Sequence, residues 1–111
     1  MNYLIKAPIK LKTTVQLPAS KSISNRVLLL NALSLVPYEI QNLADCDDTH
    51  VMTLALQTQQ SEIDIKAAGT AMRFMTAYLA GNRGNWTITG TERMRNRPIK
   101  ILVDEIGRAH V

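Results

Sequence analysis

The chain has 111 residues, of which 46% are hydrophobic and 20% charged, the composition of one globular domain rather than of a disordered or fibrous protein. Its net charge of +4 favours an anionic partner, without distinguishing nucleic acid from a small phosphorylated molecule. No apolar run could span a bilayer, no signal peptide is evident, and the single cysteine, Cys46, cannot form an internal disulfide. We therefore expect a cytoplasmic protein with no membrane partner.

The chain begins with two predicted strands and a helix. Residues 2–10 and 13–17 have the pattern of short strands with a proline in the connection, and Pro18 ends this pattern. Residues 22–34 predict a helix, because apolar side chains recur at helical spacing at Ile23, Val27, Leu30 and Leu33.

A strand and a second helix come next. Pro37 ends the first helix, and residues 38–43 favour a strand. Residues 47–59 predict a helix, in which Asp47 and Asp48 suit the positive N-terminal end and can act as caps.

The last part of the chain repeats this alternation of strand and helix. Residues 61–66 predict a strand, and residues 69–81 a helix that opens with Thr70 as its cap and closes at Gly81. Residues 85–89 predict a further strand. A last helix is expected over residues 97–106, with Pro98 in its first turn. The order predicts a mixed α/β (α+β) fold with helices covering at least one side of a sheet.

Basic residues open three of the four predicted helices. They are Lys21 and Arg26 in the first, Arg73 in the third, and Arg93, Arg95 and Arg97 just ahead of Pro98 in the fourth. The positive field at a helix N-terminus disfavours a cation there by a few tenths to about 1 kcal/mol unless an anion is bound. With an anion, free backbone N–H groups and basic side chains act in the same direction. The pattern therefore indicates an anion site.

The first helix shows the predicted site in most detail. Ser22 and Arg26 are four residues apart and share one face, while Lys21 and Asn25 form the adjacent row. A hydroxyl, an amide, an ammonium and a guanidinium would thus converge on a phosphate or carboxylate. The alternative is that Ser20 or Ser22 is a simple N-cap and Arg26 is a solvated surface residue.

Two further segments support the same interpretation less directly. Gly69 permits close approach of a ligand to the backbone, although this segment taken alone is better explained by a turn followed by a Thr70 cap. Residues 89–99 carry three arginines in a predicted loop, which could also contact nucleic acid. His50 and His110 are isolated, so the sequence offers no catalytic triad and no metal site.

Four segments together resemble one enzyme family. LPASKSISNRVLLLNAL, DCDDTHVM, AAGTAMRFM and TGTERMRNRPIKILVD have the order and spacing of EPSP synthases (3-phosphoshikimate 1-carboxyvinyltransferases), with similarity from Leu11 to Asp104. The resemblance implies a two-domain enzyme built of βαβαββ units, the inside-out α/β barrel fold, of which this chain would be an incomplete piece. Residues 1–19 would be strands of one domain, and residues 20–104 the first unit of the other.

The resemblance also implies a reaction and its residues. The reaction transfers the enolpyruvyl group of phosphoenolpyruvate to the 5-hydroxyl of shikimate 3-phosphate and releases phosphate, without a metal or organic cofactor. Lys21 would touch both substrates and act in catalysis, while Ser22 and Arg26 would hold shikimate 3-phosphate. Gly69 would let the backbone approach phosphoenolpyruvate, and Arg97 would bind its anionic groups. Arg73 would shape the site.

The sequence departs from the family pattern at three places. Ala19 replaces the usual glycine, and Lys66-Ala67 replaces Gly-Asn, which removes an asparagine contact to phosphoenolpyruvate at Ala67. Residues 105–111 depart entirely, and their reverse translation contains the start of a sequencing adapter. We hypothesise that residues 105–111 are a non-native tail, which resequencing the source DNA tests.

The resemblance further implies that the acid–base carboxylates lie outside this chain. We therefore expect the isolated chain to be inactive, and the complete enzyme to be a monomer. A sister transferase acting on a UDP-amino sugar is one alternative, but that family lacks the Ser-Lys-Ser-x-Ser-Asn-Arg motif. A basic module that binds RNA or another polyanion is a second alternative, weakened by the few scattered aromatic residues, so no nucleic-acid partner is expected.

Overall fold

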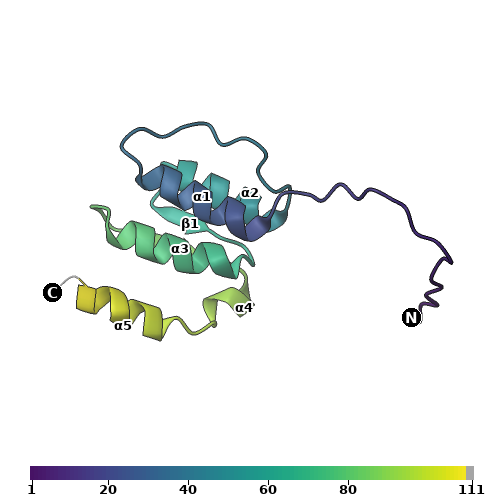
Figure 1. Cartoon of the computed structure of the whole chain (residues 1–111). Helices are drawn as coiled ribbons and strands as arrows, with labels where there is room; N and C mark the ends of the chain where they lie inside the picture. Colours follow the sequence, from purple (N-terminus) through teal and green to yellow (C-terminus); the bar gives the residue numbers. More distant parts are fainter. Residues whose placement is uncertain (110–111) are drawn as a thin grey trace.

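The computed structural model describes residues 1–109. Its elements are the helices α1 (Lys21–Leu33), α2 (Asp47–Gln57), α3 (Gly69–Ala80), α4 (Glu92–Arg95) and α5 (Lys100–Ala109), and the strands β1 (Glu62–Asp64) and β2 (Thr87–Thr89). In Figure 1, α3 lies between α1 and α5, and it contacts both helices. The segment before α1 runs away from this body as an extended chain (Figure 1).

The sheet consists of two parallel strands joined through α3. β1 and β2 pair in the register Glu62↔Thr87, Ile63↔Ile88 and Asp64↔Thr89. A further hydrogen bond extends the ladder, since the Ile65 amide donates to the Thr89 carbonyl at 2.8 Å. Parallel neighbours need a crossover, which α3 supplies. The α/β class and the strands expected within residues 61–66 and 85–89 are confirmed.

The hydrophobic core lies where α2, α3 and the sheet meet. α3 contributes Ala71, Met72, Met75 and Leu79 at helical spacing, which is why this segment is stable as a helix. Met52 of α2 and Ile65 after β1 complete the centre, and both are fully buried. Burying one such side chain contributes about 1.5–3 kcal/mol to stability.

The four helices expected from the sequence are present, but their ends differ in detail. Ser20 caps α1, because its hydroxyl accepts a hydrogen bond from the Ile23 amide at 3.3 Å. Thr70 does not cap α3, whose N-cap is Ala68, because the helix already begins at Gly69. Pro98 lies two residues before α5 rather than in its first turn.

Three expected strands are wrong. Residues 2–10, 13–17 and 38–43 form no strand, because the two strands of residues 1–109 pair with each other and a strand needs a neighbour for its backbone hydrogen bonds. The segment after Pro37 is instead held by Asn31. The side chain of Asn31 donates to the Tyr38 carbonyl at 2.7 Å and accepts from the Tyr38 amide at 2.9 Å.

The apolar stripe of α1 does not face the core. Ile23 is 65% exposed and Leu30 is 66% exposed, while Ser24 and Asn25 on another face of the helix are buried. These two polar residues can be buried because both are hydrogen-bonded: Ser24 to the segment that leads into α2, and Asn25 to α2 itself. The described chain therefore leaves an uncovered row of apolar side chains on α1.

The C-terminal helix includes part of the hypothesised tail. α5 continues through residues 105–109, whereas His110 and Val111 lie outside the described residues. The assignment of residues 105–111 to a non-native tail and of residues 1–19 to another domain both stay predictions. No helix within residues 1–109 has the length and apolar character needed to cross a bilayer.

Candidate anion-binding site

Lys21 opens α1 and links it to α2. Its ammonium lies 3.2 Å from the Asp48 carboxylate, and the lysine side chain remains 53% exposed. The N-cap of α2 is Cys46, which makes no side-chain cap hydrogen bond, so the predicted capping role of Asp47 and Asp48 is wrong. Asp48 instead forms an ion pair with Lys21, whose side chain remains half exposed.

Arg26 lies one turn further along α1, on the face that carries Ser22. Its Nη1 donates to the Ser22 carbonyl oxygen at 3.1 Å. Its guanidinium carbon lies 5.6 Å from the centroid of the Phe74 ring on α3, within the range of a cation–π contact. Ser22 and Arg26 therefore share one face, as their spacing predicts, and that face is exposed.

Two guanidinium groups flank Gly69 at the first turn of α3. An ideal Cβ at Gly69 would lie 3.1 Å from Arg97 Cζ and 3.6 Å from Arg73 Nη1. Arg73 Nη1 also donates to the Gly69 carbonyl oxygen at 3.4 Å. A side chain at Gly69 would therefore displace the Arg97 guanidinium, and the structure brings both residues together with Arg73.

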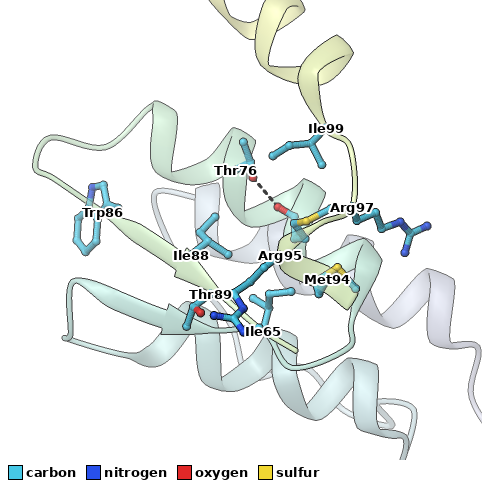
Figure 2. Close-up of a pocket in the computed structure, with 11 residues that line it drawn as sticks. Ile65, Thr76, Trp86, Ile88, Thr89, Met94, Arg95, Arg97 and Ile99 are labelled. Carbon is cyan, nitrogen blue, oxygen red and sulfur yellow. Dashed lines mark hydrogen bonds between the residues drawn. The ribbon is translucent and has the colours of Figure 1, made fainter. Parts of the chain in front are cut away.

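Arg97 borders a polar pocket on one side and an apolar pocket on the other. The polar pocket, of about 500 Å³, is lined by Ala67, Thr91, Arg93, Met94 and Arg97. The apolar pocket, of about 280 Å³, lies between α3 and β2 and includes Trp86 and Ile88 (Figure 2). Figure 2 shows the Arg97 guanidinium pointing away from those two apolar side chains.

The three arginines before α5 therefore do not act as one flexible loop. Arg93 and Arg95 belong to α4, a helix that the sequence analysis missed, and Arg97 follows it. The Arg95 side chain lies near Thr89 and Ile65 on the apolar pocket, whereas Arg93 and Arg97 line the polar one (Figure 2). α4 forms because Thr91 caps it, accepting a hydrogen bond from the Met94 amide at 3.3 Å.

Asn25 does not join the predicted anion site. It is 1% exposed, and its Oδ1 accepts a hydrogen bond from the Thr49 hydroxyl at 3.1 Å. The neighbouring Ser24 hydroxyl accepts from the Ala44 amide at 2.9 Å. These two residues tie α1 to α2, which places Lys21 beside Asp48.

Lys66 leads into α3 in an unusual conformation. Its φ of 52° lies in the left-handed region, where a side chain is disfavoured. Asp64 stabilises this turn: its carboxylate accepts from the Lys66 amide at 2.9 Å and from the Lys66 ammonium at 2.8 Å. The side-chain and backbone hydrogen bonds from Lys66 hold the pKa of the Asp64 carboxyl below its usual value.

Several residues of the site were not found from the sequence. Phe74 and Asp48 contact the predicted cations. Thr49 lies outside the site, where its hydroxyl donates to the buried Asn25 side chain between α1 and α2. Asp48 was visible as an acidic helix opening, but nothing in the sequence paired it with Lys21. No group of three or more His, Cys, Asp or Glu side chains suited to a metal ion occurs within residues 1–109.

Comparison with known proteins assigns the family. The family model described as EPSP synthase (3-phosphoshikimate 1-carboxyvinyltransferase) matches residues 5–63 and 56–110, which together include every predicted site residue. The chain belongs to the EPSP synthase family. The predicted family is therefore confirmed.

Individual EPSP synthases support the same assignment. A 3-phosphoshikimate 1-carboxyvinyltransferase of Bacteroides fragilis (strain YCH46) is 59% identical over 100% of this chain and 28% of its own length. The enzymes of the same name from Cupriavidus necator and Bordetella pertussis are 40% and 43% identical, over 94% and 83% of this chain. These alignments cover 30% and 26% of the two relatives.

The chain thus spans between a quarter and a third of the EPSP synthases that it matches. No solved structure matches it. The comparisons establish the family, and the structure establishes a mixed α/β chain with a small parallel sheet.

Proposed function

We propose that this chain is the part of an EPSP synthase that binds the phosphorylated groups of both substrates. The complete enzyme would transfer the enolpyruvyl group of phosphoenolpyruvate to the 5-hydroxyl of shikimate 3-phosphate, with release of phosphate. The observation that carries this proposal is the pair of guanidinium groups against Gly69, at the N-terminus of α3. Fixed cations at a helix N-terminus form a site for phosphate or carboxylate.

Shikimate 3-phosphate would bind at the exposed face of α1. Arg26 offers a planar guanidinium suited to two phosphate oxygens, and the Ser22 hydroxyl lies on the same face. Because Arg26 already donates one N–H to the Ser22 carbonyl, its orientation is partly set before substrate binds.

Phosphoenolpyruvate would bind beside Gly69. α3 begins at Gly69, and the absence of a side chain there makes room for the Arg97 guanidinium, which supplies charge at this helix N-terminus. Lys21 would contact both substrates from α1, where Asp48 holds it. The small side chain of Ala67 lines the same pocket as Arg97, so the missing asparagine contact would fall in this region.

The chemistry that these residues support is addition followed by elimination. The substrate hydroxyl oxygen bonds to C2 of phosphoenolpyruvate, its proton is lost, and a proton adds to C3, which gives a tetrahedral intermediate. The C2–O bond to phosphate then breaks, C3 loses a proton, and inorganic phosphate leaves. Lys21 and Arg97 would stabilise the negative charge of the reacting phosphoenolpyruvate and of the departing phosphate.

We further propose that the chain forms one βαβαββ unit of the inside-out α/β barrel, with residues 1–19 contributing to the other domain. The uncovered apolar row on α1 supports this proposal, because Ile23, Leu30 and Leu33 would be buried by other parts of a larger protein. We propose a monomeric cytoplasmic enzyme whose partners are the two small substrates.

A chimeric enzyme tests the function. Residues 1–104 of this chain replace the matching segment of the Bacteroides fragilis relative, and phosphate release is measured with both substrates. The chimera should turn over and should restore growth without aromatic amino acids to bacteria that lack their own enzyme. An inactive but folded chimera would contradict the proposal.

A point variant of the chimera tests the role of Lys21. Lys21→Gln should lower kcat by about a hundredfold or more, because it removes a cation that acts on developing charge. Lys100→Gln is the matched control, since Lys100 also forms an ion pair, at 2.6 Å to Asp104, but lies on α5. Equal kcat values for the two variants would rule out the catalytic role of Lys21.

A further inference from the structure

We infer that Phe74 is a positioning residue, which holds the guanidinium of Arg26 where it meets an anionic group, carboxylate or phosphate, of shikimate 3-phosphate. The inference rests on the proposed function and extends it to a residue on another helix. Its basis is the position of Arg26 Cζ, 5.6 Å from the centroid of the Phe74 ring. The face of an aromatic ring is negative, so it attracts a cation at this range.

The ring holds Arg26 without neutralising it. The ion pairs within residues 1–109 all join other side chains, and no carboxylate oxygen of these residues lies within 4.0 Å of the Arg26 guanidinium nitrogens. A carboxylate partner would compete with an incoming phosphate for the guanidinium N–H groups. An aromatic face contacts the flat side of the guanidinium and leaves its edge, which carries the N–H donors, open to an anion.

Phe74 is itself held by the protein core. Its ring is partly buried and packs against the cluster of hydrophobic side chains that includes Met52 and Met75. Arg26, in contrast, is exposed and has a long side chain with many rotamers. Contact with a fixed ring removes part of that freedom before the substrate arrives, which favours binding.

The neighbouring residue connects the same helix to the other half of the site. Arg73 Nη1 donates to the Gly69 carbonyl, beside Arg97. Two consecutive residues of α3 thus contact the groups proposed to bind the two substrates. Arg73 contacts Gly69, at the proposed phosphoenolpyruvate site, and Phe74 contacts Arg26, at the proposed shikimate 3-phosphate site. α3 therefore sets the relative positions of the two anion sites.

The test measures shikimate 3-phosphate affinity of the chimeric enzyme by calorimetry. Phe74→Leu should weaken binding by about two- to fivefold, the range of an exposed cation–π contact, whereas Phe74→Tyr should bind as the parent does. Tyr78→Leu is the matched control, because Tyr78 is a partly buried aromatic residue one turn further along α3 and should leave affinity unchanged. Phosphoenolpyruvate KM should change little in all three.

A double-mutant cycle separates positioning from general packing. In an Arg26→Ala background, Phe74→Leu should cause no further loss, since Phe74 acts through Arg26. Should Phe74→Leu fold poorly, pentafluorophenylalanine at residue 74 keeps the packing but removes the negative ring face, and it should weaken binding equally.

Two results would overturn the inference. The first is that Phe74→Leu and pentafluorophenylalanine at residue 74 both bind shikimate 3-phosphate as tightly as the parent does. The second is that Phe74→Leu weakens this binding by the same factor in the parent and in the Arg26→Ala background. A folded parent chimera that binds neither substrate would overturn the proposed function and the inference with it. A parent that binds and turns over, with variants of Phe74 unchanged, would overturn the inference alone.

Discussion

The guanidinium of Arg97 occupies the space that a side chain at Gly69 would need. Its Cζ lies 3.1 Å from the position of an ideal Cβ at Gly69, and its Nη1 is closer still. Since Gly69 has no left-handed φ, an alanine there would fit the backbone but would displace Arg97. The glycine at residue 69 therefore makes room for the Arg97 guanidinium, and it is not needed for a left-handed turn.

Gly69→Ala in the chimera should raise the KM for phosphoenolpyruvate by about tenfold or more, because it moves a charged hydrogen-bond donor away from the ligand. The KM for shikimate 3-phosphate and the melting temperature should stay near the parental values. Gly81→Ala is the control, since a Cβ there meets only the Tyr78 carbonyl oxygen at 3.6 Å. Parental phosphoenolpyruvate kinetics in Gly69→Ala would contradict the proposed site.

Ala67→Asn should improve phosphoenolpyruvate binding. Residue 67 lines the same pocket as Arg93 and Arg97, and the resemblance to the family places an asparagine contact there. One restored hydrogen bond should lower the KM for phosphoenolpyruvate by about three- to tenfold. Steady-state kinetics measures this change, and Ala80→Asn at the far end of α3 is the control. A KM that rises or stays constant would show that the pocket does not receive this substrate.

Asp64→Asn should remove a stabilising contribution that depends on pH. The pKa of Asp64 is lower in the folded chain than its ordinary value of 3.8, mainly through the side-chain hydrogen bond from Lys66. The contribution is therefore present above the unfolded pKa and is lost as pH falls through the folded one. Urea unfolding of the chimera should show a difference between parent and variant at about pH 7 that shrinks as the pH falls below the ordinary value of 3.8.

A second acidic residue on the same strand provides the control for Asp64. Glu62→Gln is this control, because Glu62 forms no ion pair within the described residues. The predicted effect is small, since the Asp64 side chain is 46% exposed and solvent screens its interaction with Lys66. A difference between parent and Asp64→Asn that widens at low pH would be opposite in sign to the expectation.

Thr49→Val should lower the free energy of unfolding by about 1–3 kcal/mol, because it leaves the buried Oδ1 of Asn25 without its donor. The variant keeps the shape of the side chain, so no cavity forms. Thr53→Val is the control, since its hydroxyl donates at 2.9 Å to the carbonyl oxygen of residue 49, within the same helix. Urea unfolding that shows equal losses for both would mean that the Asn25 contact contributes little.

Local sequence determined the helices and the family. α1, α2 and α3 form where helical periodicity predicts them, since their hydrogen bonds lie within the segment itself, although the predicted caps of α2 and α3 are wrong. The motifs around Lys21, Gly69 and Arg97 were sufficient to indicate the EPSP synthase family, which the comparisons confirm. The positions of Lys21 and Arg26 in the first two turns of α1 also followed from the order of residues alone.

Only the tertiary structure decided which side chains meet. The predicted strands before Pro18 and after Pro37 do not form, because a strand depends on a neighbour that local sequence does not specify. The polar Asn25 is buried and the apolar Ile23 is exposed, because the helix face that packs is chosen by its partner helix. The contact of Arg26 with Phe74 likewise exists only because α1 packs against α3.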